Sequence, residues 1–437
     1  MQELANYRHL AAHMPAGADC AEVQAEKQTV ISITVTDGRF DEMSAANVTD
    51  LFARVISQGK SGLSHSQNLA CEPEILLGQA FENSHFSDQC LSEPMNRPHD
   101  LTSRFEEREQ EHSSIDELKL TALRLEEALR NAAGQSSLSQ IRLTESIRTI
   151  WLVNSQGCDL TASRRIVEAE ATLVQQHQRH MIFNEILSST ELANLNEDDF
   201  LVLLSHCRTR QLPAVFSGSG KFRAIIDASV VCNMLNTAWQ FFAAPLYLSG
   251  STPLAGRLGQ AVFADNINIR DLPAMSGSGY TFAFDCEGSA STDVQLVRDG
   301  RLQSLIHTLA SARAMAVKPT GNAGRKTLLS GTLHTQVSAM PKNFCLMPGR
   351  DSLAGLIEKL RDGIYIHESY DVFHSINIAS GAFNVPCKGI LIRNGEMAGV
   401  AEGLAIQGQL IDLLASVECV ADDVRVLPMV MLKSYTV

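Results

Sequence analysis

Pairs of strands joined by tight turns are the feature of this sequence that most restricts its fold. Residues 21–47 alternate apolar and polar side chains on both sides of Asp37-Gly38, and such alternation is typical of strands with one buried face. The Asp-Gly dipeptide suits a hairpin turn because glycine adopts positive φ angles at little cost. Further turns between strands are indicated at Gln58-Gly59, Asn154 to Gly157, Asp299-Gly300 and Asn394-Gly395. We therefore expect antiparallel strands in both halves of the chain.

The sequence also predicts helices between the hairpins, and the clearest covers residues 114–134. Its leucines are expected to form a buried stripe opposite a charged face. The stripe comprises Leu118, Leu120, Leu123, Leu125 and Leu129. Ser114 or Asp116 is the candidate N-cap, and Gly134 is the candidate stop. Further helices are expected from residue 4 to near Pro15, over residues 192–210 and over residues 223–243.

Together these elements indicate an α+β protein of two domains. Residues 1–205 are expected to form an N-terminal α/β domain with antiparallel hairpins and helices. Residues 206–437 are expected to form a mostly antiparallel β domain with a few helices, because glycine-rich turns and short strands follow Ser249.

Composition and charge exclude several classes of function. The 36 basic residues against 49 acidic ones give a formal net charge of -13, so no nucleic acid partner is expected. Apolar runs are far shorter than the roughly 20 residues of a membrane-spanning helix, so no membrane partner is expected. The 10 cysteines form no CxxC pair and the chain starts without a signal peptide, which indicates a cytoplasmic protein with reduced thiols.

The segment from His367 to His374, HESYDVFH, contains residue types that bind zinc. A zinc-protease helix places its two histidines one helical turn apart, whereas these two are seven positions apart. The preceding residues favour a strand, on which the two side chains point to opposite faces. A metal site is therefore not the preferred interpretation, and a divergent site that includes Cys387 stays open as the alternative. Cys387 itself is expected to be a small buried thiol.

Two other short motifs are better explained without catalysis. Residues Phe216 to Phe222, FSGSGKF, lack the first glycine and the hydroxyl residue of a phosphate-binding loop. Asp285 and Glu287 are two positions apart, which on a strand puts both carboxylates on one face and permits acid–base catalysis. A solvated strand face that leads into a turn at Gly288 is the preferred interpretation, and the catalytic one stays open.

The order of several segments resembles the TldD/PmbA family, also called modulator of DNA gyrase. The resemblance covers most of the chain and rests on segments that include NSQGCDL, GRLGQAVFADNINIRDLP, PTGNAGR and ASGAFNVPCKGILIRNGEMAGVAEGLAIQGQLIDLL. The last segment is the most specific and is similar to the TldE side of the family. In TldD members, a central helix carries HExxxH, with two zinc-binding histidines and a glutamate as general base. Residues 227–242 take the place of that helix here and contain no histidine and no glutamate.

This resemblance implies a TldE-like, metal-free and non-catalytic subunit of a cytosolic peptidase, without a cofactor. Its expected partners are a TldD-like zinc protease subunit in a heterodimer, or a second copy in a homodimer, and an extended peptide that binds by strand addition. The candidate substrate-binding residues lie in two glycine-rich turns and are Gly279, Tyr280, Ser380, Gly381 and Phe383. Two alternatives stay open. One is an independent hydrolase with a divergent site at His367, Glu368 and His374, and the other is a homodimeric peptide-binding protein without catalysis.

Overall fold

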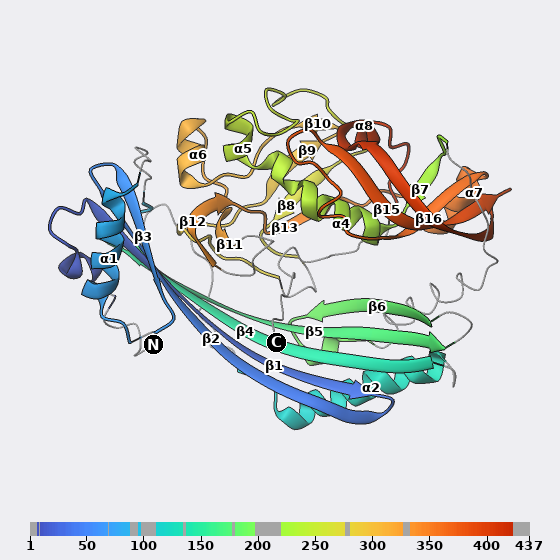
Figure 1. Cartoon of the computed structure of the whole chain (residues 1–437), viewed down its shortest axis with the longest axis horizontal. Coiled ribbons are helices and arrows are strands. Elements are labelled where there is room, and N and C mark those ends of the chain that lie inside the picture. Colours follow the sequence, from blue (N-terminus) through green and yellow to red (C-terminus); the bar gives the residue numbers. More distant parts are fainter. Residues whose placement is uncertain are drawn as a thin grey trace. The chain divides into compact units, whose positions relative to one another are not determined.

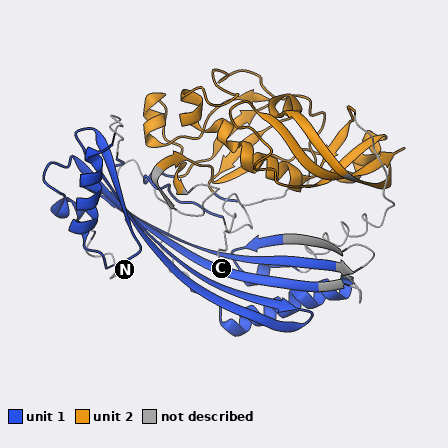
Figure 2. Cartoon of the chain, in the orientation of Figure 1, with its two compact units in different colours: residues 1–208, 274–290 blue, residues 209–273, 291–437 orange. Residues whose placement is uncertain are grey.

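The computed structural model describes residues 7, 9–68, 70–87, 95–97, 111–133, 137–176, 180–196, 220–275, 280–326 and 333–422. The chain forms two compact units (Figure 2). Unit 1 contains Met1–Arg208 and Ala274–Ala290, and unit 2 contains Thr209–Pro273 and Ser291–Val437. Both units combine helices with antiparallel sheets, so the α+β class is confirmed (Figure 1).

Unit 1 is built on a six-stranded antiparallel sheet with the strand order β3-β2-β1-β4-β5-β6 (Figure 1). Its strands are β1 Cys20–Thr36, β2 Arg39–Ser57, β3 Lys60–Ser66, β4 Ser137–Asn154, β5 Asp159–Gln176 and β6 His180–Ser189. The predicted turn between β1 and β2 is confirmed, with φ of 48° at Asp37 and 73° at Gly38. The turns predicted after β2 and after β4 are confirmed as well.

Two helices cover one face of this sheet at different ends of β1. Helix α1, Pro73–His85, packs in a cluster with Ala21 and Val23, whereas α2, Ile115–Ala133, packs with Ile33 and Val35. All four β1 residues occupy odd positions, and side chains at alternate positions of a strand share a face. Both helices therefore lie on the same side of the sheet. Unit 1 also contains the short 3-10 helices Leu10–His13 and Leu192–Asn194.

Helix α2 confirms the predicted leucine stripe except at one position. Leu118, Leu125 and Leu129 are buried and Leu123 is partly buried against them, but Leu120 is 68% exposed and the expectation for it is wrong. A residue two positions beyond Leu118 points to the opposite side of the helix, because each residue turns the chain by about 100°. Of the two candidate caps, Ser114 is the one used: its hydroxyl accepts the N–H of Glu117, whose carboxylate accepts the N–H of Ser114.

The other face of the unit 1 sheet is polar, and it is buried too. Even-numbered residues of β1 line it, among them Glu22 and Glu26. Residues 280–290 contact this face, where the Arg54 guanidinium of β2 lies 3.3 Å from Glu22 and 3.2 Å from Glu287. Because buried charges persist only when they are paired, these contacts explain why residues 280–290 belong to unit 1.

The described residues of unit 2 form three small sheets. One has the strand order β10-β9-β8-β13, the second pairs β11 with β12, and the third has the order β16-β15-β14-β7. The strands are β7 Ala224–Ile226, β8 Ile269–Leu272, β9 Val294–Arg298, β10 Arg301–Leu302, β11 Ala323–Lys326, β12 Leu333–Ala339, β13 Asn343–Leu346, β14 Gly363–Ser369, β15 Ala382–Arg393 and β16 Glu396–Gln409. The predicted turns at Asp299-Gly300 and Asn394-Gly395 are confirmed, with positive φ at all four residues.

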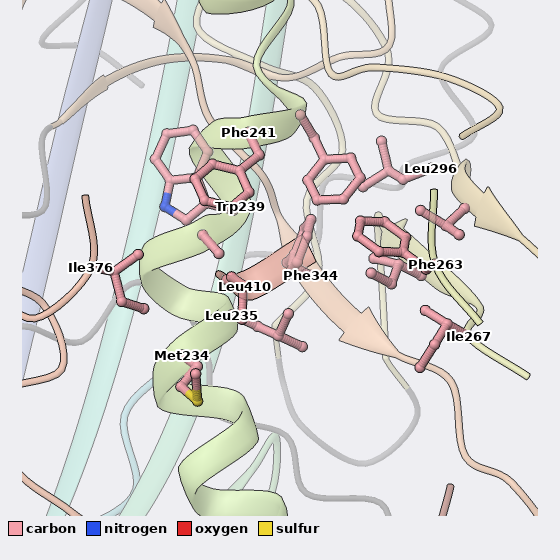
Figure 3. Packing of buried hydrophobic residues seen from close by; sticks show 14 of the residues in the cluster. Met234, Leu235, Trp239, Phe241, Phe263, Ile267, Leu296, Phe344, Ile376 and Leu410 are labelled. Carbon is pink, nitrogen blue, oxygen red and sulfur yellow. The ribbon is translucent and has the colours of Figure 1, made fainter. Parts of the chain in front are cut away.

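The core of unit 2 forms around helix α4, Ala228–Ala238. Met234, Leu235 and Trp239 pack in one cluster with Phe263 and Phe344 (Figure 3). The other helical elements are η5 Trp239–Phe242, α5 Ala244–Leu248, α6 Leu309–Ala314, α7 Leu353–Leu360 and α8 Leu410–Ala415. Within the described ranges, no helix has both the length and the apolar character needed to cross a membrane.

Three predicted helices differ from the structure or lie partly outside it. The helix expected over residues 223–243 begins instead as strand β7, which pairs with β14, and the helix starts only after Asp227. Most of the helix expected over residues 192–210 lies outside the described residues, as do residues 4–6 and 8 of the opening one. The described parts of these two segments contain only the short 3-10 helices.

Candidate functional site

Helix α4 starts at a defined point because Asp227 caps it. The Asp227 carboxylate accepts hydrogen bonds from the Ser229 N–H at 2.9 Å and from the Ser229 hydroxyl at 2.6 Å. The second carboxylate oxygen accepts the hydroxyl of Tyr365, a residue of β14, at 2.5 Å. The beginning of α4 is thereby joined to the sheet that ends in β16.

One side of α4 carries polar side chains that stay partly exposed. They follow the i, i+3, i+4, i+7 spacing of a single helix face and are called the α4 stripe: Ser229, Cys232, Asn233 and Asn236. The opposite side is apolar and buried in the unit 2 core. The polar residues follow the same helical period as the apolar ones, so their spacing in the sequence is the signal that could have predicted this stripe.

Hydrogen-bonding capacity is the chemical property of the α4 stripe. Each asparagine amide donates and accepts hydrogen bonds, as a peptide bond does, and Ser229 adds a hydroxyl. The stripe is therefore suited to contact the backbone of a bound peptide.

The residues of the HESYDVFH segment are not brought together by the fold. His367 is partly buried at an irregularity in the pairing of β14 with β15. His374 follows that strand, is exposed, and contacts Asp371 at 2.5 Å. Cys387 of β15 is buried as expected, and burial raises the pKa of its thiol. Among the described residues, no group of three or more His, Cys, Asp or Glu side chains is arranged to hold a metal ion.

Strand β16 forms the edge of its sheet in the part of the chain that the structure describes. Its last residues, 403–409 (GLAIQGQ), carry no charged side chain and are called the β16 edge. Proteins usually protect an exposed sheet edge with charged residues, proline or a covering element. An uncharged edge without proline favours pairing with another extended strand.

The hydrogen bonds of β15 indicate which backbone groups of the β16 edge point outward. In an antiparallel sheet, the N–H and C=O of one residue point to the same side. The Pro386 carbonyl and the Asn384 N–H bond to residues on the far side of β15 from β16. Their register partners on β16, Ala405 and Gln407, therefore point away from β15. The β16 edge presents the backbone N–H and C=O groups of these two residues to a further strand.

Three predicted substrate-binding residues lie at the end of the β16 edge. The N–H of Leu410 donates to the Gly381 carbonyl at 2.8 Å, and Phe383 pairs with Gly408. Phe383 is buried in the unit 2 core, and Gly381 adopts a φ of 75°. Ser380 is the exposed member of the three, so its side chain is the one available to a ligand.

The other two predicted substrate-binding residues are not part of this surface. Gly279 lies outside the described residues. Tyr280 belongs to unit 1, is 2% exposed, and donates its hydroxyl to Glu168 of β5 at 2.5 Å. Burial, reinforced by the Glu168 carboxylate, raises the pKa of Tyr280 far above its usual range. In unit 1, Tyr280 anchors residues 280–290 to the polar face of the sheet.

Asp285 and Glu287 are buried and hold a turn. The Asp285 carboxylate accepts the N–H groups of Glu287 and Ser289, both at 2.9 Å, and φ at Gly288 is 77°. The expected turn is confirmed, but the expected solvated face is wrong. Glu287 is buried because Arg54 neutralises it.

Sequence comparison identifies the family. The family model of the PmbA/TldA metallopeptidase C-terminal domain matches residues 219–437. This chain belongs to the PmbA/TldD family. A metalloprotease of Methanocaldococcus jannaschii is 21% identical over 93% of this chain and 90% of that protein. A metalloprotease of Methanothermobacter thermautotrophicus is 28% identical, and that match spans 49% of this chain and 46% of that protein.

Two solved structures share the PmbA/TldD fold of this chain. A putative modulator of DNA gyrase from Thermotoga maritima has a TM-score of 0.81 and 20% identity, and the match covers 98% of this chain and 95% of that one. TldE from Thermococcus kodakarensis has a TM-score of 0.79 and 17% identity, with 96% and 94% covered. The resemblance noted in the sequence is confirmed.

Because PmbA/TldD relatives are named as metalloproteases, the residues of α4 have to be compared with the needs of a zinc ion. Zinc in a peptidase is held by imidazole, thiolate or carboxylate groups, and a glutamate activates the water. Helix α4, in the place that the resemblance assigns to the HExxxH helix, offers one thiol, at Cys232, and otherwise only hydroxyl, amide and apolar groups. The carboxylate of its cap, Asp227, is bonded to Ser229 and Tyr365. The residues present do not fit a zinc ion held in the TldD manner.

Proposed function

We propose that this chain is a metal-free, non-catalytic subunit of a TldD/TldE-type metallopeptidase in the cytoplasm. Its partner is a TldD-like subunit with an intact HExxxH motif, and the pair acts on unfolded peptides in maturation or degradation. The observation that carries the proposal is the composition of α4, which has neither histidine nor glutamate, whereas the HExxxH motif requires both.

In this proposal, the chain contributes surfaces that hold an extended peptide. The β16 edge offers outward N–H and C=O groups at Ala405 and Gln407, and these pair with peptide backbone whatever its side chains are. The α4 stripe offers amides of the same hydrogen-bonding type. Recognition through backbone groups selects for extended segments, because a folded substrate has already paired those groups.

A homodimeric peptide-binding protein without catalysis is the second candidate, and the same β16 edge supports it. It differs from the first in needing no TldD-like partner. An independent hydrolase is less well supported, because His367 and His374 are not assembled with Cys387 into a metal-binding group among the described residues.

Reconstitution tests the proposal. The full chain is purified alone and together with a TldD-like protein that carries HExxxH, and cleavage of an unstructured peptide is followed by mass spectrometry. We expect cleavage by the mixture, inhibition by a zinc chelator, and no cleavage by this chain alone. A mixture in which the partner's HExxxH glutamate is replaced by glutamine is the matched control and is expected to be inactive. Chelator-sensitive cleavage by this chain alone would contradict the proposal.

A further inference from the structure

Two arginines lie side by side on the buried polar face of the unit 1 sheet. Arg148 of β4 and Arg164 of β5 are directly opposite each other in the strand register. Both occupy even positions, on the face to which Glu26 of β1 also belongs. Like charges directly opposite on neighbouring strands destabilise a sheet. The fold therefore keeps this pair at a cost.

Arg148 has an ion-pair partner, whereas Arg164 has none among the described residues. The Arg148 Nη2 donates to Glu26 at 2.6 Å. The Nε and Nη1 atoms of Arg164 are buried and have no hydrogen-bond partner in the described part of the chain, and the same holds for Nε of Arg148. The nearby Glu168 accepts the hydroxyl of Tyr280. Buried N–H groups without protein acceptors are costly, so these atoms are donors that a ligand can use.

An aromatic ring fixes the Arg164 guanidinium. Its Cζ lies 4.6 Å from the centroid of the Phe282 ring, in a cation–π contact. Burial, followed by repulsion from Arg148, lowers the pKa of Arg164 to about 9, so the group keeps its charge at neutral pH. Arg164 as a whole is partly exposed, although its Nε and Nη1 atoms are buried. The site thus combines a fixed cation with unused donors.

We propose that Arg164, with Arg148 beside it, binds the carboxylate group of a ligand on the polar face of unit 1. A carboxylate carries its charge on two coplanar acceptor oxygens and matches the planar donors of a guanidinium. A phosphate dianion is a poorer fit, because Glu26 and Glu168 also act electrostatically on Arg164 and would repel a double charge more strongly.

The carboxylate belongs to a peptide, either to an acidic side chain or to the C-terminus, and this assignment rests on the proposed function. The binding of a carboxylate by Arg164 does not depend on the proposed function. The experiments therefore use both peptides and a free carboxylate.

Calorimetric titration of the full chain separates the two peptide sources. One unstructured octapeptide is made in four versions, with a central Glu or Gln and with a free or amidated C-terminus. We expect the chain to bind a version with a carboxylate more tightly than the others. We expect Arg164→Gln to weaken the binding of that version by about 10-fold or more, in line with a lost charged hydrogen bond. Arg142→Gln is the matched control, since Arg142 is an even-numbered residue of the same β4 strand. We expect it to change the dissociation constant by less than about two-fold.

Chemical modification of arginine tests the carboxylate site without a peptide. Phenylglyoxal attacks arginine side chains, and mass spectrometry locates the modified residue. We expect sodium acetate to slow the modification of Arg164 several-fold relative to sodium chloride at the same ionic strength, and to leave Arg142 unaffected. Circular dichroism checks the fold of each variant. If Arg164→Gln does not fold, Arg164→Lys replaces it, because lysine keeps the charge and loses the planar donors.

The outcomes distinguish the two proposals. Equal affinity for all four peptides together with no acetate protection overturns the carboxylate site and leaves peptide binding intact. Acetate protection of Arg164 without binding of any peptide supports the carboxylate site and contradicts the peptide ligand of the proposed function. Equal weakening of peptide binding by Arg142→Gln and Arg164→Gln also overturns the proposed carboxylate site, because the effect then comes from net charge alone.

Discussion

The hydroxyl of Tyr365 donates a hydrogen bond to Asp227 at 2.5 Å, and both side chains are buried. This contact joins β14 to the first turn of α4, which Asp227 also caps. It therefore fixes the helix that carries the α4 stripe to the sheet whose outer strand carries the β16 edge. The Asp227 carboxylate is thus one link between the two surfaces that the proposed function uses, beside the pairing of β7 with β14.

Replacement of that carboxylate is expected to destabilise unit 2. Asp227→Ala removes a helix cap and leaves the Tyr365 hydroxyl without its acceptor, so we expect the free energy of unfolding to fall by about 2–4 kcal/mol. Asp227→Asn keeps an acceptor oxygen and is expected to lower the free energy of unfolding by less. Urea denaturation followed by Trp239 fluorescence in a Trp151→Phe background measures both. A loss below about 0.5 kcal/mol for Asp227→Ala would contradict this role.

Gly62 of β3 lies against the backbone of α1. A Cβ at Gly62 would be 1.9 Å from the Ala80 carbonyl oxygen and 2.2 Å from the Ser84 nitrogen. We expect Gly62→Ala to destabilise unit 1 by about 3 kcal/mol, because the helix backbone has to move. Gly78→Ala, in α1 itself, meets no atom within 4 Å and is expected to stabilise by about 0.5–1 kcal/mol. Thermal unfolding followed by Trp151, which packs against the α1 cluster, measures the difference, and equal midpoints would contradict it.

Two buried groups are expected to give opposite pH dependences of stability. Burial lowers the pKa of His307 to about 4, below its ordinary value of about 6.5. The unfolded chain then binds a proton that the folded chain does not, so stability is lost as pH falls from about 6.5 to about 4. Burial raises the pKa of Asp271 to about 6, above its ordinary value of about 3.9. The stabilisation from its protonated form is complete below about pH 3.9 and is lost as pH rises through about 6.

Single variants separate these two contributions. Between pH 7 and pH 4.5, His307→Gln is expected to lose less stability than the wild type, and Asp271→Asn is expected to lose more. Urea denaturation at a series of pH values gives the slopes, which do not depend on the constant cost of each substitution. Three parallel curves would show that neither group titrates differently in the folded and unfolded states.

The backbone N–H of Gln407 is expected to contribute to peptide binding. Gln407→Pro removes an outward-pointing donor without removing a hydrogen bond to β15, and proline is tolerated on edge strands. We expect it to weaken the binding of an extended peptide by about five-fold or more, in line with one lost hydrogen bond. Gln407→Ala keeps the N–H and is the matched control, with affinity close to the wild type. Similar losses in both variants would indicate that the Gln407 side chain, and not the edge, makes the contact.

Local features of the fold could be predicted from the sequence because neighbouring residues decide them. Asp37-Gly38 forms its turn through the positive φ angles that this dipeptide tolerates. Leu120 was assigned to the wrong side of α2 because its residue type, and not its position in the helical period, guided the assignment. Glu22 and Glu287 could not be predicted as buried, since each depends on Arg54, and no local pattern links positions so far apart in the chain.

The candidate site was predictable to a similar degree. The lack of histidine and glutamate in α4 is visible in the sequence once the family resemblance fixes the position of that helix. The outward direction of the Gln407 backbone groups depends on hydrogen bonds of the neighbouring strand. The position of Arg164 opposite Arg148 depends on the register of β4 and β5. Tertiary contacts decide both, so they required the structure.

The zinc content of the purified full chain is the first test of whether this chain is a metal-free subunit. The chain is dialysed exhaustively against zinc-free buffer and its metal content is measured by elemental analysis. We expect no stoichiometric zinc, at most about 0.1 ion per chain, because α4 lacks the ligands of the TldD site. About one zinc ion per chain, lost when His367 or Cys387 is replaced by alanine, would contradict the metal-free subunit and support an independent hydrolase.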